Sequence, residues 1–134
     1  MLVALYLEMS GRVELRVIRA GRGVVARQFF EPAAADAVST FCQQHIGDDL
    51  FFGVALRDDS DLGTLDHCTA LTVLFADIDF KMFAGGEAEA RERLARCPIP
   101  PSLIVASGGG LHVYWLLTES IPLPADADLA TSLL

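Results

Sequence analysis

Two aspartates separated by one residue, Asp77 and Asp79, are the residues of this sequence best suited to phosphate chemistry. They follow the apolar run 71–76 and enclose an isoleucine, which indicates the end of a buried β-strand. Residues two apart on a strand project from the same face, so both carboxylates are expected to converge. Such a pair repels unless a cation neutralises it, and Mg²⁺ and Mn²⁺ prefer oxygen ligands. The pair therefore predicts a metal site of the kind that positions phosphate oxygens for phosphoryl transfer.

A second candidate group lies in the segment Ser107-Gly108-Gly109-Gly110-Leu111-His112. Consecutive glycines permit backbone angles closed to other residues, and exposed amides in such a turn can bind a phosphate. Ser107 adds a hydroxyl donor, and His112 can donate to a phosphate or orient a nucleotide. A P-loop is excluded because no Lys-Ser/Thr pair ends the glycine run.

Each group has a simpler interpretation when it is taken alone. The aspartates can be polar residues at a strand end, and His112 can fill a polar gap in the core beside a flexible hairpin. The occurrence of both groups after apolar strands favours two sides of one nucleotide site. A zinc site from His67, Cys68 and a further cysteine is disfavoured because no close cysteine pair exists.

The elements that carry these residues follow from periodicity and turn residues. We expect a hairpin over 13–17 and 24–30, a helix over 33–45 and a strand over 50–56. Next come a strand over 71–80, a helix over 87–96, strands over 103–106 and 111–117, and a helix that begins at Pro124. This order predicts an α+β fold: a mixed or antiparallel sheet with helices packed mostly on one face.

Composition limits the class of protein. The chain has 134 residues, of which 52% are hydrophobic, a total that fits one compact domain. Its mean hydropathy of +0.41 is high for a small domain, so we expect part of the apolar surface to face a partner. Three dispersed cysteines predict a reducing, cytoplasmic location, and no apolar run is long enough for a membrane helix. The net charge of −8 argues against general nucleic-acid coating.

Two segments together carry a resemblance to a known family: Phe75-Ala76-Asp77-Ile78-Asp79 and Pro101-Ser102-Leu103-Ile104-Val105-Ala106-Ser107-Gly108-Gly109-Gly110-Leu111-His112-Val113-Tyr114-Trp115. The pattern resembles the archaeo-eukaryotic primase superfamily, specifically the primase-polymerases of plasmids, phages and other mobile elements. The segment 53–57, which ends at Arg57, resembles the one that often precedes the acidic strand in that branch. The similarity runs from about Val13 to Leu117.

The resemblance implies an RNA-recognition-like primase catalytic core that starts in 71–134, preceded by a small α/β unit over 1–57, within one truncated domain. It also implies a nucleotidyltransferase that synthesises DNA-replication primers with Mg²⁺ or Mn²⁺, on a DNA template, with a replicative helicase as candidate partner. Asp77, Asp79 and His112 would be catalytic, and the two aspartates would bind metal. The nucleotide-binding residues would be Arg57, Ser107, Gly108, Gly109, Gly110 and His112.

The family pattern also includes a third acidic residue and a basic segment well after the histidine strand. This sequence reaches Leu134 before either, so we expect the 134-residue chain to polymerise little by itself. Two alternatives stay open. One is a non-catalytic nucleotide- or nucleic-acid-binding module of the same fold, and the other is a metal-dependent nuclease, since paired aspartates also serve phosphodiester hydrolysis.

Overall fold

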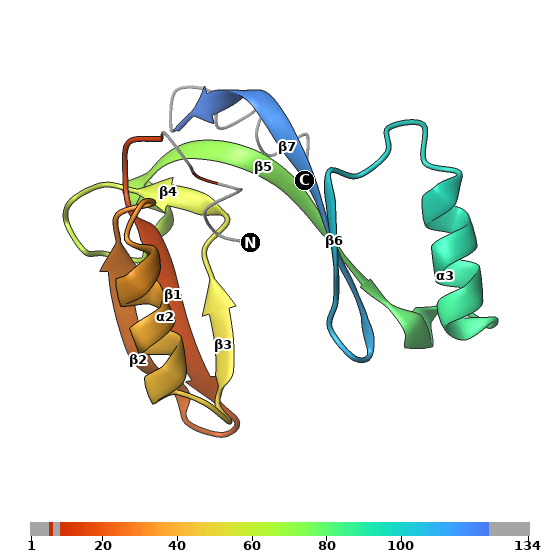
Figure 1. The fold of residues 1–134 in the computed structure, drawn as a ribbon, viewed down its shortest axis with the longest axis horizontal. Helices are drawn as coiled ribbons and strands as arrows, with labels where there is room; N and C mark the ends of the chain where they lie inside the picture. The colour runs from red at the N-terminus through yellow and green to blue at the C-terminus, as the bar shows by residue number, and fades with distance from the viewer. Residues whose placement is uncertain (1–5, 7–8, 124–134) are drawn as a thin grey trace.

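The structure, a computed structural model, describes Tyr6 and residues 9–123 of the chain. Two short 3-10 helices, η1 (Leu65–His67) and η2 (Phe80–Met82), lie directly before and after strand β5 (Cys68–Asp79). The α+β class expected from the sequence is confirmed (Figure 1). The strands and α-helices are β1 (Val13–Arg19), β2 (Gly23–Phe30), α2 (Ala35–Gln44), β3 (Asp49–Phe52), β4 (Ala55–Arg57), β5 (Cys68–Asp79), α3 (Gly86–Ala95), β6 (Leu103–Ala106) and β7 (Gly110–Pro122).

The first sheet contains β2, β1 and β3 in that order, with antiparallel pairing throughout. Alternate side chains of β1 project to one face, where Leu15 and Val17 pack with Phe30 of β2 and Phe41 of α2. The rings of Phe30 and Phe41 meet edge to face, with centroids 5.7 Å apart, an arrangement that aromatic pairs prefer. Helix α2 therefore covers this face, and the predicted hairpin and helix are confirmed.

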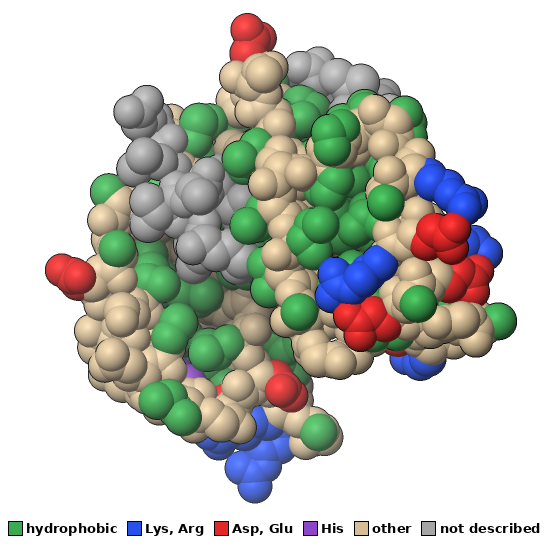
Figure 2. All heavy atoms as spheres, turned by 45° about the vertical axis from the view of Figure 1, so that its right-hand side comes forward, with side chains coloured by type: hydrophobic (Ala, Val, Ile, Leu, Met, Phe, Trp, Pro, Cys, Tyr) green, Lys and Arg blue, Asp and Glu red, His purple; other side chains and the backbone are tan. Residues whose placement is uncertain are grey.

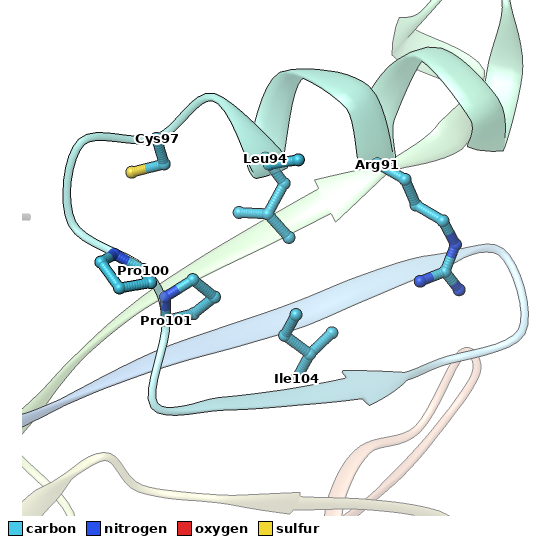
Figure 3. Close-up of a pocket in the computed structure, with 7 residues that line it drawn as sticks. Arg91, Leu94, Cys97, Pro100, Pro101 and Ile104 are labelled. Atoms are coloured by element: carbon cyan, nitrogen blue, oxygen red, sulfur yellow. The ribbon is translucent and has the colours of Figure 1, made fainter.

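The second sheet contains β4, β5, β7 and β6 in that order, again with antiparallel pairing. Helix α3 lies beside β6, and Leu94 and Ile104 point toward each other in Figure 3, where they line a pocket of about 210 Å³. Ile104 pairs with Val113, the neighbour of His112. Because successive strand residues alternate between faces, α3 lies against the face opposite to that of His112.

The chain passes from one sheet to the other at Gly53 and Val54, which corrects two expectations. The single strand expected over 50–56 is wrong, because β3 pairs with β1 whereas β4 pairs with β5. The expected single sheet with helices mostly on one face is also wrong, since each of the two sheets has its own helix. The apolar run is continuous in sequence, but the backbone amide of Gly53 donates to the carbonyl of Glu14 and ends the β3 ladder.

A shared core joins the two sheets. It contains Val13 of β1, Leu56 of β4, Val73 of β5 and Tyr114 of β7, together with Tyr6. The Tyr6 hydroxyl donates to the carbonyl of Gly53 at 2.8 Å, so the crossing point is held by a buried hydrogen bond. Burial raises the pKa of the Tyr6 phenol well above its usual value.

Glu14 is the least expected residue of the interior. Glu14 alternates with the apolar residues of β1, a pattern that predicts a side chain facing solvent. Its side chain is nevertheless 0% exposed. Its carboxylate lies 2.9 Å from Nε of Arg27, 3.0 Å from Nη2 of Arg57 and 3.5 Å from Nε of Arg16. Arg27 belongs to β2 and Arg57 to β4, so one carboxylate links both sheets. The loop after β4 closes over this cluster at Gly63, where a Cβ would meet the side chains of Glu14 and Arg27.

Three further expectations concern membrane-spanning helices, the cysteines and the helix that begins at Pro124. No helix of the described part is long and apolar enough to cross a membrane. Cys42, Cys68 and Cys97 are all free thiols. The helix expected from Pro124 lies outside the described residues.

Replacement of Glu14 tests the link between the sheets. Glu14→Gln leaves three guanidinium groups without a counter-charge in a buried site, and we expect a loss of about 3–5 kcal/mol in the free energy of unfolding. Glu119→Gln removes the same charge from an exposed position of β7 and should change stability by less than about 0.5 kcal/mol. Urea unfolding followed by circular dichroism measures both; equal midpoints for the two variants would contradict this role of Glu14.

Candidate active site

The two aspartates lie near the end of β5, on the face that α3 leaves open. Strand β4 pairs only with the first part of β5, up to Leu71, so in the described residues the end of β5 pairs with β7 alone. Asp77 and Asp79 alternate with Ile78 and therefore share one face, as the sequence predicts. The side chains of Asp77 and Asp79 are 68% and 39% exposed. Both carboxylates are thus accessible to a ligand.

His112 lies directly opposite Asp77 in the pairing of β5 with β7. Directly opposed residues of an antiparallel pair share a face, and Nε2 of His112 lies 3.8 Å from Oδ1 of Asp77. This distance permits an ion pair when the ring is protonated but exceeds that of a hydrogen bond. The next residue on this face of β7, Tyr114, has its phenol pKa raised by burial and by the charge of Asp77. Strand register alone therefore brings the imidazole to the acidic pair.

The glycine turn between β6 and β7 is held close to the end of β5. The amide of Ser107 donates to the carbonyl of Gly110, and the carbonyl of Gly109 accepts from the amide of Phe80. Gly108 has a φ of 93°, a backbone angle that favours glycine. In the described part of the chain, the amides of Gly108 and Gly109 donate to no other backbone group. They are the amides that the sequence predicts as phosphate donors.

These elements enclose an open polar pocket of about 180 Å³. Arg57 is not among the lining residues, because its guanidinium is engaged with Glu14 and donates to the carbonyl of Thr64. Gly108 also lies outside the lining. The pocket is lined by Asp77, Asp79, Ser107, Gly109, Gly110 and His112.

Lys81, the only lysine of the sequence, neutralises one of the two carboxylates. Asp79 caps η2 by accepting from the Lys81 amide at 3.1 Å, and the Lys81 ammonium contacts the other carboxylate oxygen. Hydrogen bonds from the Lys81 side chain and backbone lower the pKa of Asp79, while Asp79 raises that of Lys81. Lys81 therefore favours the ionised form of Asp79 and occupies one approach to its carboxylate.

The donor set fits a hard divalent cation that retains water. Two accessible carboxylates offer oxygen ligands, and Mg²⁺ is commonly held by one or two carboxylates together with water and substrate phosphates. Among the described residues, no group of three His, Cys, Asp or Glu side chains is placed to hold a metal. Asp77 and Asp79 would thus supply only part of a coordination shell.

A larger groove of about 460 Å³ adjoins the polar pocket and shares Asp77 and His112 with it. Of the groove residues, the sequence predicted Arg57, Asp77 and His112 as site residues. It missed Arg16, Phe51 and Phe75, which also line the groove. Phe51 and Phe75 are 48% and 42% exposed. Figure 2 shows further hydrophobic side chains over much of one face of the molecule. The only sequence signal for these residues is the high mean hydropathy, which does not say where apolar surface lies.

Comparisons with protein-family models, with curated proteins and with solved structures found no match for this chain.

The close approach of β7 to β5 at Gly110 is testable with a pair of glycines. A Cβ at Gly110 would collide with the carbonyl oxygen of Ile78, whereas one at Gly109 meets nothing within 4 Å. Gly110→Ala should destabilise the protein by about 1–3 kcal/mol, because the strands that carry Asp79 and His112 must separate. Gly109→Ala should cost less than about 1 kcal/mol. Thermal unfolding of both variants measures the difference, and equal stabilities would contradict the contact.

The pairing of Lys81 with Asp79 predicts a change in titration. Lys81→Met removes the ammonium but keeps the backbone amide that Asp79 accepts from, so the Asp79 pKa should rise part of the way to its usual value. Lys81→Arg retains the charge and should keep the Asp79 pKa low. Carboxyl ¹³C NMR titration measures both variants. An Asp79 pKa that does not move in Lys81→Met would show that the ion pair does not form in solution.

Proposed function

We propose that this chain carries a metal-dependent nucleotidyl-transfer site of the archaeo-eukaryotic primase type, which extends nucleic-acid primers on a DNA template. One observation carries the proposal. Asp77 and Asp79 lie far in sequence from Ser107 and His112, yet these side chains line one open pocket. Together they offer carboxylates for a cation and donors for phosphate, the two requirements of phosphoryl transfer.

The residues of the chain divide the chemistry between them. Asp77 and Asp79 would hold Mg²⁺ or Mn²⁺, which supplies charge neutralisation at the reacting phosphate. Ser107 and the amide of Gly109 would donate to phosphate oxygens, and an imidazole N–H of His112 is a further donor. In the proposed reaction a primer 3′-hydroxyl attacks the α-phosphorus of the incoming nucleotide and pyrophosphate leaves. The side chains orient these groups on the rigid face of a sheet.

The division of the protein into two sheets supports this assignment. The second sheet is antiparallel, carries the polar pocket on one face and has α3 on the other. In the proposed reading this sheet is the start of the RNA-recognition-like core, and the first sheet with α2 is the small α/β unit before it. Arg57, the last residue of β4, would act from the groove rather than from the pocket.

A non-catalytic nucleotide-binding module is the second candidate. The observation that favours it is that no group of three His, Cys, Asp or Glu side chains among the described residues is placed to hold a metal. Such a module would bind nucleotide and metal without transferring a nucleotidyl group. Primer extension by the full-length gene product separates the two candidates.

Metal binding tests the aspartates directly. Asp77→Asn and Asp79→Asn should each weaken Mn²⁺ binding by at least the roughly 10- to 100-fold that loss of a supporting contact costs metal sites. Asp66→Asn removes one charge from an exposed position of η1, before β5, and should leave Mn²⁺ affinity unchanged. Mn²⁺ titration followed by electron paramagnetic resonance measures all three.

The catalytic proposal has its own readout. In the full-length gene product, primer extension with Mg²⁺ or Mn²⁺ should stop in Asp77→Asn and Asp79→Asn and persist in Asp66→Asn, because only the first two remove a proposed metal ligand. Undiminished extension by either of the first two variants would rule out the metal assignment. Metal and nucleotide binding without any extension would instead favour the binding module.

A further inference from the structure

A row of side chains crosses the first sheet beside the polar pocket, and two of its three members, Arg16 and Phe51, line the groove. Arg16 of β1 lies directly opposite Arg27 of β2 on one side and Phe51 of β3 on the other. Directly opposed residues of antiparallel strands share a face, so two guanidinium groups and one aromatic ring stand side by side. Arg16 and Phe51 line the groove together with Phe75 and Tyr114 of the second sheet.

The row concentrates positive charge in an acidic protein. Arg91 and Arg93 of α3 and its C-cap residue Arg96 each pair with a glutamate of the helix, and red and blue side chains are intermixed on the right of Figure 2. Arg19 pairs with Asp48, and Arg12 lies near three acidic side chains. At Glu14, by contrast, three guanidinium groups meet one carboxylate, an excess of two positive charges over the acidic contacts found among the described residues.

Several polar atoms of Glu14 and the arginines around it also lack hydrogen-bond partners among the described residues. Arg57 is 8% exposed, yet within residues 9–123 and Tyr6 its Nε has no hydrogen-bond partner, and the same holds for the buried Nε of Arg16. The contacts to Glu14 have ion-pair distances, but neither of its carboxylate oxygens accepts an aligned hydrogen bond. Like charges opposed on neighbouring strands destabilise a sheet. An anion on the groove side of Arg16 would therefore relieve a local excess of positive charge.

We propose that the row Phe51–Arg16–Arg27 holds a single nucleic-acid strand, with Phe51 stacked on a base and Arg16 and Arg27 bound to its phosphates. Proteins that bind single strands combine aromatic platforms with a positive groove in this way. The aromatic ring requires an accessible base face, which a duplex does not offer. The groove reaches Asp77 and His112, so a strand on this row leads into the polar pocket. The inference deepens the proposed function and rests on it for the role of the strand as template or primer.

The negative net charge of the chain does not oppose this site. Charges further apart than about 8 Å are largely screened at physiological ionic strength, so a phosphate at Arg16 is governed by the local excess at Glu14. The proposal therefore predicts local, salt-dependent binding rather than a coat of nucleic acid.

Binding is measured by fluorescence anisotropy with a labelled oligothymidylate of roughly twelve nucleotides, the length range of single-strand sites. All titrations contain EDTA, so that binding is independent of metal at Asp77 and Asp79. Phe51→Ala should weaken binding roughly 10-fold or more, whereas Phe51→Tyr retains the ring and should bind like the wild type. Because Phe51 is about half exposed, its truncation tests the site without disturbing the core.

Arg16→Gln should weaken binding and reduce the slope of log affinity against log salt by about 0.7, the value for one phosphate contact on a single strand. Arg22→Gln removes the same charge from the exposed turn between β1 and β2 and should leave the slope unchanged. Equal effects of these two variants, or wild-type affinity in Phe51→Ala, would overturn the proposal. It would also be overturned if a free nucleoside triphosphate competed as well as the oligonucleotide at equal concentration.

Metal binding at the aspartates and strand binding at the row are measured separately, so one proposal can be wrong while the other holds. Asp79→Asn should bind the oligonucleotide in EDTA at least as well as the wild type, because it removes a negative charge near the strand. Loss of Mn²⁺ binding in that variant with intact strand binding supports both proposals. If Phe51→Ala and Arg16→Gln leave oligonucleotide binding unchanged, this inference alone is wrong, even when the aspartates bind metal.

Discussion

A buried carboxylate surrounded by arginines is the interaction on which the arrangement of this protein depends. Glu14 lies at the point where the two sheets approach, and it contacts Arg27 of one sheet and Arg57 of the other. Removing a charge from water is costly unless opposite charges surround it, so Glu14 holds both strands near itself. The groove exists because the sheets meet at this cluster and at the core around Leu56 and then diverge. Arg57 is consequently more a structural residue than a mobile ligand-binding arm.

The polar pocket depends on a second constraint, the register between β5 and β7. With Asp77 opposite His112 and Asp79 opposite Gly110, the carboxylates, the imidazole and the glycine turn occupy one end of one sheet face. Helix α3 packs behind these strands through Leu94 and Ile104. Because the polar side chains project from strands and not from a long loop, their relative positions are set by backbone hydrogen bonds. Gly110 is required there since the carbonyl of Ile78 leaves no room for a side chain.

Charge is distributed in a way that total composition conceals. The chain carries −8 overall, yet the groove has an acidic part at Asp77 and a positive part at Arg16 and Arg57. An acidic part suits a divalent cation and a positive part suits phosphate, so one groove offers places for both partners of a phosphoryl transfer. The glutamates Glu87, Glu89 and Glu92, by contrast, each pair with a nearby arginine. Local pairing, and not net charge, therefore decides which ligands this surface favours.

Local sequence patterns were sufficient to predict most of the helices and strands and the side chains that line the polar pocket. Apolar runs predicted the strands that carry Asp77 and His112, and a triple glycine predicted the turn at Ser107, because both signals depend on residues close in sequence. The sequence did not reveal the break at Gly53, since an apolar run looks the same whether its halves join one sheet or two. It also did not reveal that Glu14 is buried or that Phe51 stands beside Arg16. Those facts depend on strands distant in sequence pairing in one register, and only the tertiary structure decides that, because long-range packing sets which side chains share a face and which are shielded from water.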